Sequence, residues 1–279
     1  MAIAHLLPSP FAGPQPQNVG DPHVLAFANQ KGGVAKTTTT LNLGVALRER
    51  GLKVLCIDLD PQGNLTMSQG LNPDSIARSM YDVLVYRLPL EQVIERREID
   101  LAVASIDLAG AELALASQIG RERALEKALA PIRDRYDYIL IDTPPSLGLL
   151  TLNALVASDA VLIPLTCEYF ALEGLADLVS TLRRVRAALN PSLDIAGVVM
   201  TMYDERTNLG QQVARDIRQF FQDRVFTTVI PRNIRLGEAP SHGLPAILYD
   251  VKSRGSEAYL ALARELLARE AAPTEPSHG

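Results

Sequence analysis

The 279-residue sequence has no tryptophan, only two cysteines, and no apolar run near the roughly twenty residues that a membrane-spanning helix needs. The two cysteines have no paired spacing, which argues against a disulfide framework and against a Cys-x-x-Cys metal or redox site. We therefore expect a cytoplasmic protein without a transmembrane segment or a signal peptide. Since 47% of the residues are hydrophobic, the chain can bury one large α/β core.

An excess of positive charge is also absent, because the net charge is −5. The charged residues are nevertheless distributed unevenly along the chain. Residues 1–180 carry 14 Lys/Arg and 21 Asp/Glu, whereas residues 181–254 carry 11 and 7. A nucleic-acid contact surface or an ordinary solvated helix face would each produce this local excess, so the count alone leaves both open.

The composition divides the chain into three parts. Residues 1–22 are rich in Pro, Gly and Gln without periodicity, which predicts a flexible arm. Residues 23–270 predict one α/β domain, whose last helix spans residues 255–270 with an apolar side that packs on the core. Residues 271–279 include two prolines and a glutamate without apolar periodicity and predict a disordered tail.

The stretch of residues 27–40 has the order of elements that a phosphate-binding loop needs. Residues 24–27 predict a buried strand, and apolar positions at helical spacing predict a helix from about Lys36 to Arg50. Adjacent Gly32 and Gly33 let backbone N–H groups approach an oxyanion at the positive end of that helix. Lys36 could then reach the terminal phosphates. A basic surface turn is the alternative interpretation.

The strict phosphate-loop pattern G-x-x-x-x-G-K-[ST] is not met, because Gln30 and Ala35 occupy the positions of its two glycines. The sequence instead has a variant, K-G-G-x-x-K-T, in which Lys31 adds a second lysine at the start of the loop. Thr37 ends the variant and places a hydroxyl where a magnesium ion would lie.

Carboxylates follow two further apolar stretches. Asp58 and Asp60 end the strand predicted at residues 53–58, and Asp142 ends the strand predicted at residues 138–142. Because the carboxyl ends of parallel strands form the ligand crevice of an α/β sheet, these side chains could support magnesium or orient a water. An ordinary strand-to-turn junction is the alternative for each motif taken alone.

Together these motifs resemble the deviant phosphate-loop ATPases, which include ParA/Soj proteins, MinD and the nitrogenase iron protein. The resemblance covers about residues 23–265. It implies a single-domain α/β fold of the phosphate-loop NTPase type, with a mostly parallel, twisted sheet flanked by helices. It further implies that Lys31 reaches the nucleotide of the other subunit in a dimer, that Lys36 acts within its own subunit, and that Asp60 positions the hydrolytic water.

The resemblance also assigns the remaining site residues. The residues implied to bind ATP are Lys31, Gly32, Gly33, Val34, Ala35, Lys36, Thr37, Thr38, Met202, Pro231 and Asn233. Those implied around the metal are Thr37, Asp58 and Asp142, and those implied to contact DNA are Arg206 and Arg235.

In function, the resemblance implies a magnesium-dependent ATP hydrolase with a slow basal rate that forms a homodimer with ATP. Its implied partners are non-specific double-stranded DNA and a ParB-like centromere-binding protein, with a nucleoid-associated location in the cytoplasm. One alternative is a MinD-like division regulator on the membrane, although the last predicted helix mixes acidic and basic residues and favours no stable membrane association. A metabolic or electron-transfer ATPase on the same fold is the other alternative.

Overall fold

The computed structural model describes residues 23–168 and 173–271. The predicted arm, residues 272–279 of the predicted tail, and residues 169–172 lie outside the described residues. The strands are β1 (His23–Phe27), β2 (Val54–Asp58), β3 (Ile94–Arg96), β4 (Asp100–Ala102), β5 (Tyr138–Asp142), β6 (Ala160–Thr166), β7 (Asp194–Tyr203) and β8 (Val225–Pro231). They form one eight-stranded sheet in the order β3-β4-β2-β5-β1-β6-β7-β8.

The sheet is parallel except at one edge, where β3 pairs with β4 in the antiparallel sense. Strand β1 lies between β5 and β6, so the chain leaves the middle of the sheet at Phe27 and enters the phosphate loop there. The chain adds β2 to β5 on one side of β1 and β6 to β8 on the other. Where the direction of strand addition changes in this way, a ligand crevice opens at the carboxyl ends of the strands. The predicted fold class is thereby confirmed, and the sheet order places the loop at its centre.

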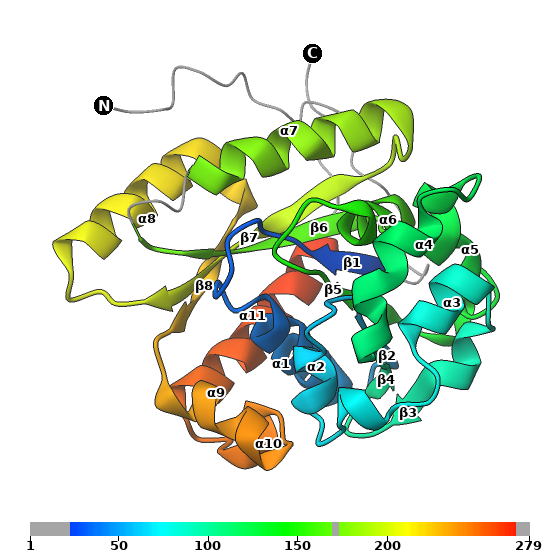
Figure 1. Ribbon diagram of the computed structural model, residues 1–279. Helices are drawn as coiled ribbons and strands as arrows, with labels where there is room; N and C mark the ends of the chain where they lie inside the picture. The colour runs from blue at the N-terminus through cyan, green and yellow to red at the C-terminus, as the bar shows by residue number, and fades with distance from the viewer. Residues whose placement is uncertain (1–22, 169–172, 272–279) are drawn as a thin grey trace.

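Helices cover both faces of the sheet (Figure 1). They are α1 (Lys36–Arg48), α2 (Asn64–Met67), α3 (Met80–Tyr86), α4 (Ala111–Leu115), α5 (Ala124–Leu129), α6 (Leu149–Ala157), α7 (Glu173–Ala188), α8 (Asn208–Phe221), α9 (Ile234–Glu238), α10 (Ala246–Tyr249) and α11 (Arg254–Ala271). Helices α7 and α8 lie on one face, and α1 and α11 lie on the other. No helix in the described part of the chain is long and apolar enough to cross a membrane.

The alternation of side chains along β1 separates two cores. Val24 and Ala26 belong to the core under α3 to α8, whereas Leu25 and Phe27 belong to the core under α1 and α11. Because both faces are covered, the strand reads as a continuous apolar run. Helix α11 buries Tyr259 in the second core, as expected for a packing helix.

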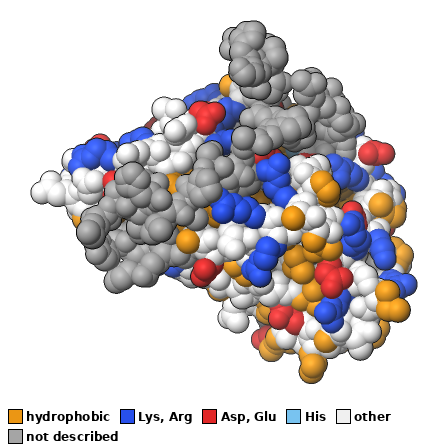
Figure 2. All heavy atoms as spheres, turned by 90° about the horizontal axis from the view of Figure 1, so that it is seen from above, with side chains coloured by type: hydrophobic (Ala, Val, Ile, Leu, Met, Phe, Trp, Pro, Cys, Tyr) orange, Lys and Arg blue, Asp and Glu red, His pale blue; other side chains and the backbone are white. Residues whose placement is uncertain are grey.

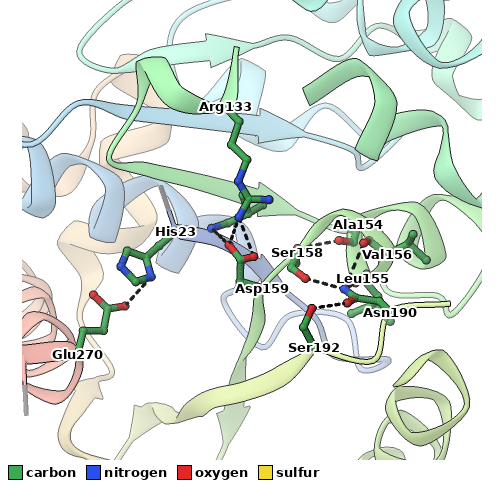
Figure 3. A network of polar contacts seen from close by, with 11 residues as sticks. His23, Arg133, Ala154, Leu155, Val156, Ser158, Asp159, Asn190, Ser192 and Glu270 are labelled. Atoms are coloured by element: carbon green, nitrogen blue, oxygen red, sulfur yellow. Dashed lines mark hydrogen bonds and ion pairs between the residues drawn. The ribbon is translucent and has the colours of Figure 1, made fainter. Parts of the chain in front are cut away.

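The amino edge of the sheet is held by side-chain hydrogen bonds (Figure 3). Asp159 forms an ion pair with Arg133 at 2.7 Å and accepts a hydrogen bond from the Val24 amide at 2.8 Å. The buried Asn190 amide donates to the carbonyl oxygens of Leu155, Val156 and Ser158 at 3.1, 3.2 and 2.7 Å. These bonds satisfy backbone groups that the end of α6 leaves unpaired.

Candidate functional site

The phosphate loop folds through two left-handed residues. Gly33 has φ of 73° and Ala35 has φ of 63°, and α1 begins directly after Ala35. An alanine in this conformation is strained by about 1 kcal/mol, which explains why glycine is usual in the strict pattern. An added Cβ at Gly32 or Gly33 would meet no atom within 4 Å, so the outer side of the loop is open. The loop therefore presents backbone to any ligand at the start of α1.

Lys36 lies under the loop and is only 6% exposed. Its Nζ donates to the carbonyl oxygens of Asn29 at 3.2 Å and Lys31 at 3.4 Å. Burial lowers the pKa of this lysine, and the nearby charges of Asp142 and Asp60 act in the opposite direction. An ammonium held by carbonyl oxygens at the mouth of an open loop is placed to bind an anion.

The structure brings Thr37 and Asp142 together, although 105 positions separate them in sequence. The Thr37 hydroxyl donates to Asp142 Oδ2 at 2.7 Å, while Asp142 Oδ1 is buried without a hydrogen-bond partner among the described residues. Burial raises the pKa of Asp142 well above its usual value, and the charge of Asp58 adds to this effect. A buried carboxylate oxygen without a partner fits a place beside a hydrated cation.

Asp58 is fully buried and is fixed by α2. Its Oδ2 accepts hydrogen bonds from the Thr66 amide at 2.8 Å and the Thr66 hydroxyl at 2.7 Å. Burial raises the pKa of Asp58 to about 6, and the hydrogen bonds from Thr66 limit the rise. Oδ1 accepts the Asp60 amide at 3.2 Å. Asp58 thus shapes the turn after β2 as well as lying near Asp142.

Asp60 is 7% exposed and lies in the turn after β2. Its Oδ1 accepts the Gln62 amide at 2.9 Å, whereas its Oδ2 accepts no hydrogen bond from the described residues and can accept one from a water. No group of three or more His, Cys, Asp or Glu side chains within residues 23–168 and 173–271 is arranged to bind a metal directly.

Lys31 forms an ion pair with Glu168 at 2.6 Å, just after the carboxyl end of β6. The side chains are 35% and 52% exposed, so the pair is open to solvent. The hydrogen bond from Lys31 lowers the pKa of Glu168. The two lysines of the loop therefore differ in surroundings: one is buried beneath the loop, and the other is tied to a surface carboxylate.

Three of the residues implied to bind ATP lie at the carboxyl ends of β7 and β8. Met202 has φ of 49° and a side chain that is 37% exposed, just after Thr201 donates to the Val34 carbonyl oxygen at 3.0 Å. Asn233 uses its Oδ1 to accept the Arg235 amide at 2.8 Å and so caps α9. Pro231 ends β8 and is partly buried. The structure thus ties the residue before Met202 to the phosphate loop and gives Asn233 a structural role.

Arg206 and Arg235 lie after β7 and β8 and are exposed, but neither is without a partner. Arg206 forms two hydrogen bonds with Asp204, at 2.8 and 2.7 Å. Arg235 pairs with Glu238 at 2.8 Å. On the described part of the face that carries α7 and α8, Lys and Arg side chains are scattered among other types (Figure 2). A DNA phosphate would have to compete with these carboxylates for both arginines.

The sequence of this chain matches known proteins over most of its length. A family model described as an AAA domain matches residues 22–195. The sporulation initiation inhibitor protein Soj of Bacillus subtilis is 52% identical over 248 residues, which cover 88% of this chain and 98% of Soj. The chromosome partitioning protein ParA of Caulobacter vibrioides is 52% identical over 252 residues, with 88% and 94% covered. The chain belongs to the Soj and ParA family.

A solved structure supports the same fold for this Soj and ParA family member. The crystal structure of cobyrinic acid a,c-diamide synthase from Mycobacterium smegmatis, with bound ADP and magnesium, has a TM-score of 0.80 and 40% sequence identity. The match covers 92% of this chain and 99% of the synthase chain. The predicted resemblance to ParA/Soj proteins and the phosphate-loop fold are therefore confirmed.

Several residues of this family member's site have roles that the motifs did not indicate. Asn29 donates from Nδ2 to the Pro164 carbonyl oxygen at 2.7 Å and accepts the Lys31 amide at 3.0 Å, which fixes the start of the loop. Thr66 holds Asp58, and Glu168 holds Lys31. Only proximity in the fold identifies them, although the polar Asn29, two residues after a buried strand, was a signal in the sequence.

Proposed function

We propose that this chain is a magnesium-dependent ATPase that dimerises with ATP, binds double-stranded DNA without sequence specificity, and releases it on hydrolysis. The proposal depends most on one observation, the buried Lys36 beneath an open loop next to the Thr37–Asp142 pair. Soj and ParA relatives named for chromosome partitioning support a role in moving chromosomal or plasmid DNA. A slow basal rate, stimulation by a ParB-like partner and a location on the nucleoid belong to this proposal.

The proposed roles follow the positions of the charges. Backbone N–H groups of residues 32–38 and Lys36 bind the phosphates at the start of α1. Thr37 would hold magnesium directly, and Asp142 and Asp58 would support its water shell. Bound magnesium supplies charge neutralisation on the phosphates. Asp60 orients the water that attacks, through the carboxylate oxygen that other residues leave unbonded.

Dimerisation and DNA binding each require an exchange of ion partners. Lys31 leaves Glu168 to reach the nucleotide of the second subunit. Arg206 and Arg235 exchange Asp204 and Glu238 for DNA phosphates when both subunits present them on one surface. Contacts made by arginine to phosphate are salt-sensitive and indifferent to sequence.

The contacts of α11 do not favour the membrane alternative. Glu265 accepts hydrogen bonds from the Thr227 and Thr228 amides at 2.7 and 2.8 Å, and the Arg269 guanidinium lies 4.2 Å from the centre of the Phe226 ring. Glu265 and Arg269 are therefore engaged with β8 rather than available to anionic lipid.

The test is binding to a random-sequence DNA duplex at fixed salt with no nucleotide, with ADP and with ATP. We expect wild type to bind only with ATP, and Asp60→Ala to bind at least as well because the ATP state persists. Lys36→Ala and Arg206→Glu should each lose about tenfold or more in affinity. Arg264→Glu, a charge reversal on the exposed side of α11, is the matched control.

Binding that ignores the nucleotide would contradict the coupling of ATP to DNA. ATP hydrolysis that responds neither to DNA nor to a ParB-like protein would instead favour a metabolic ATPase on this fold. ATP-dependent flotation with anionic liposomes would favour the membrane alternative.

A further inference from the structure

A groove at the amino edge of the sheet lies at the opposite end of the strands from the phosphate loop. It has a volume of about 440 Å³. Its walls come from the end of α1, the start of β2, the β3–β4 hairpin and the turn before β5. None of its residues takes part in the function proposed above. A cavity of this size can hold a small ligand.

Basic side chains dominate the lining. Five of them face two carboxylates, Glu98 and Asp100. Both carboxylates are already engaged: Glu98 forms an ion pair with Arg48 at 3.3 Å, and Asp100 accepts a hydrogen bond from the Tyr136 hydroxyl at 2.8 Å. The remaining positive charge of the groove is therefore not neutralised by its own acidic residues.

Three of the basic side chains are available to a ligand. The side chains of Lys53, Arg96 and Arg97 are exposed and form no hydrogen bond or ion pair with any residue that the structure describes. Their gathering in one groove is unexpected on a chain with a net charge of −5. Two guanidinium groups and one ammonium on a rim suit a phosphate-bearing ligand, since arginine binds phosphate oxygens through paired N–H groups.

Part of the floor of the groove is apolar, although polar atoms make up more of the exposed lining. Leu52 and Tyr136 are half-buried there, beside Val54 and Ile99, which are 5% and 3% exposed. Leu52 and Tyr136 next to a cationic rim can contact the organic body of a ligand whose charged end meets the rim. A free inorganic anion would use the rim alone.

We propose that this groove binds a small phosphate-bearing ligand of nucleotide size. Arg96 and Arg97 contact its phosphates, and its organic body lies on the floor beside Tyr136. A long polyanion such as duplex DNA fits less well, because the cations line one groove of about 440 Å³ rather than an extended track for a continuous phosphate backbone.

The probe is guanosine triphosphate, titrated by calorimetry into the full chain whose phosphate-loop site is saturated with ADP and magnesium. The titration is repeated in Lys36→Ala, so that binding at the phosphate loop is recognised. We expect one saturable site per chain in both proteins. The double variant R96E/R97E should weaken it by at least about tenfold, and R96Q/R97Q by less. Inorganic tripolyphosphate should bind more weakly than the nucleotide, because it does not use the floor.

The control R264E reverses an equally exposed arginine on α11 and should leave the affinity unchanged. Cooperative thermal unfolding at the wild-type temperature shows that each variant is folded. The absence of a saturable site in the ADP-loaded protein would overturn the proposal, as would equal affinity in wild type and R96E/R97E. Loss of duplex binding in R96E/R97E, without any nucleotide site in wild type, would assign the groove to a nucleic-acid surface instead.

Discussion

At the carboxyl edge of the sheet, polar groups are left for a ligand to satisfy, whereas those drawn at the amino edge in Figure 3 satisfy one another. Asp142 Oδ1 is buried without a partner, and Ala35 and Met202 adopt left-handed backbone conformations. At the opposite edge, Asn190 donates to three carbonyl oxygens and Asp159 accepts both a guanidinium and a backbone amide.

The two ends of the strands therefore differ in role: residues at the carboxyl end serve function, and residues at the amino end stabilise the fold. Strain and unpaired buried groups cost free energy in the unliganded protein, and they are tolerated where a ligand compensates them. Paired networks at the other edge stabilise the fold that holds the site. Substitutions at the carboxyl edge should therefore change chemistry, and substitutions at the paired network should change stability.

Lys36→Ala should have the largest effect. Removal of the ammonium beneath the loop takes away the main cation for the terminal phosphates, so the rate of ATP hydrolysis should fall on the order of 1,000-fold. The free energy of unfolding should change by no more than about 1 kcal/mol, because the lysine is itself destabilised by burial. Steady-state hydrolysis and urea unfolding measure the two quantities. Lys127→Ala on α5 is the control, and a large stability loss in Lys36→Ala would contradict the separation of the edges.

Asn190→Asp should have the next largest effect, on stability. The variant keeps the shape of the side chain but replaces a donor of three hydrogen bonds with a carboxylate facing carbonyl oxygens. We expect a loss of about 3 kcal/mol or more in the free energy of unfolding. The hydrolysis rate per folded molecule should stay within about twofold of wild type.

Ser192→Ala is the milder variant at the same network. It removes only the hydroxyl that donates to Asn190 Oδ1 at 2.8 Å and should cost about 1 kcal/mol. Equal losses in the two variants would mean that the three carbonyl contacts contribute little.

Asp58 should make the nucleotide-free protein less stable as the pH rises. Its pKa is raised from 3.8 to about 6 by burial, so the folded state binds the proton more tightly than the unfolded state. The resulting stabilisation is present below the unfolded pKa and is lost as the pH rises through the folded pKa, up to about 3 kcal/mol. Urea unfolding between about pH 4 and 7, without nucleotide or magnesium, should show a flatter pH dependence in Asp58→Ala. Parallel curves would contradict this source of the slope.

Glu168→Gln should have the smallest effect. The ion pair with Lys31 is open to solvent, so it is weak. Its removal should free Lys31 and favour the ATP-bound dimer by less than about 1 kcal/mol. We expect the affinity of the ATP-bound dimer, measured by sedimentation, to increase about two- to fivefold. The gain should vanish in a Lys31→Ala background, and Glu257→Gln on α11 should produce none. A gain that persists without Lys31 would assign Glu168 another role.

The motifs predicted the centre of the site because their physics is local. A buried strand, two glycines and a helix beginning at Lys36 are neighbours in sequence, and the structure places them as expected. The helix ends at Arg48, two residues earlier than predicted. The carboxylates of Asp58 and Asp142 were found because parallel strands bring their carboxyl ends to one edge.

Partners that are distant in sequence could not be predicted in this way. Glu168 is 137 positions from Lys31, and nothing in its local pattern indicates the ion pair. Asp204 is only two positions from Arg206, so their ion pair could have been considered from the sequence. Residues at this spacing pair only where the loop conformation brings their side chains to the same side. The Asn233 side chain also caps α9 through its Oδ1, a role that the sequence did not indicate, and its contact with ATP stays a prediction.

The sequence by itself determined the fold class, the phosphate loop and the carboxylates, because strand, turn and helix preferences act over a few residues. Only the tertiary structure decided which charges are free. The sheet order brings Glu168 to Lys31 and Thr37 to Asp142, while the same order gathers Lys53, Arg96 and Arg97 around one groove. Whether two charges pair depends on their distance in space. For Lys31 with Glu168 and for Thr37 with Asp142, that distance is set by how the fold brings together residues more than 100 positions apart.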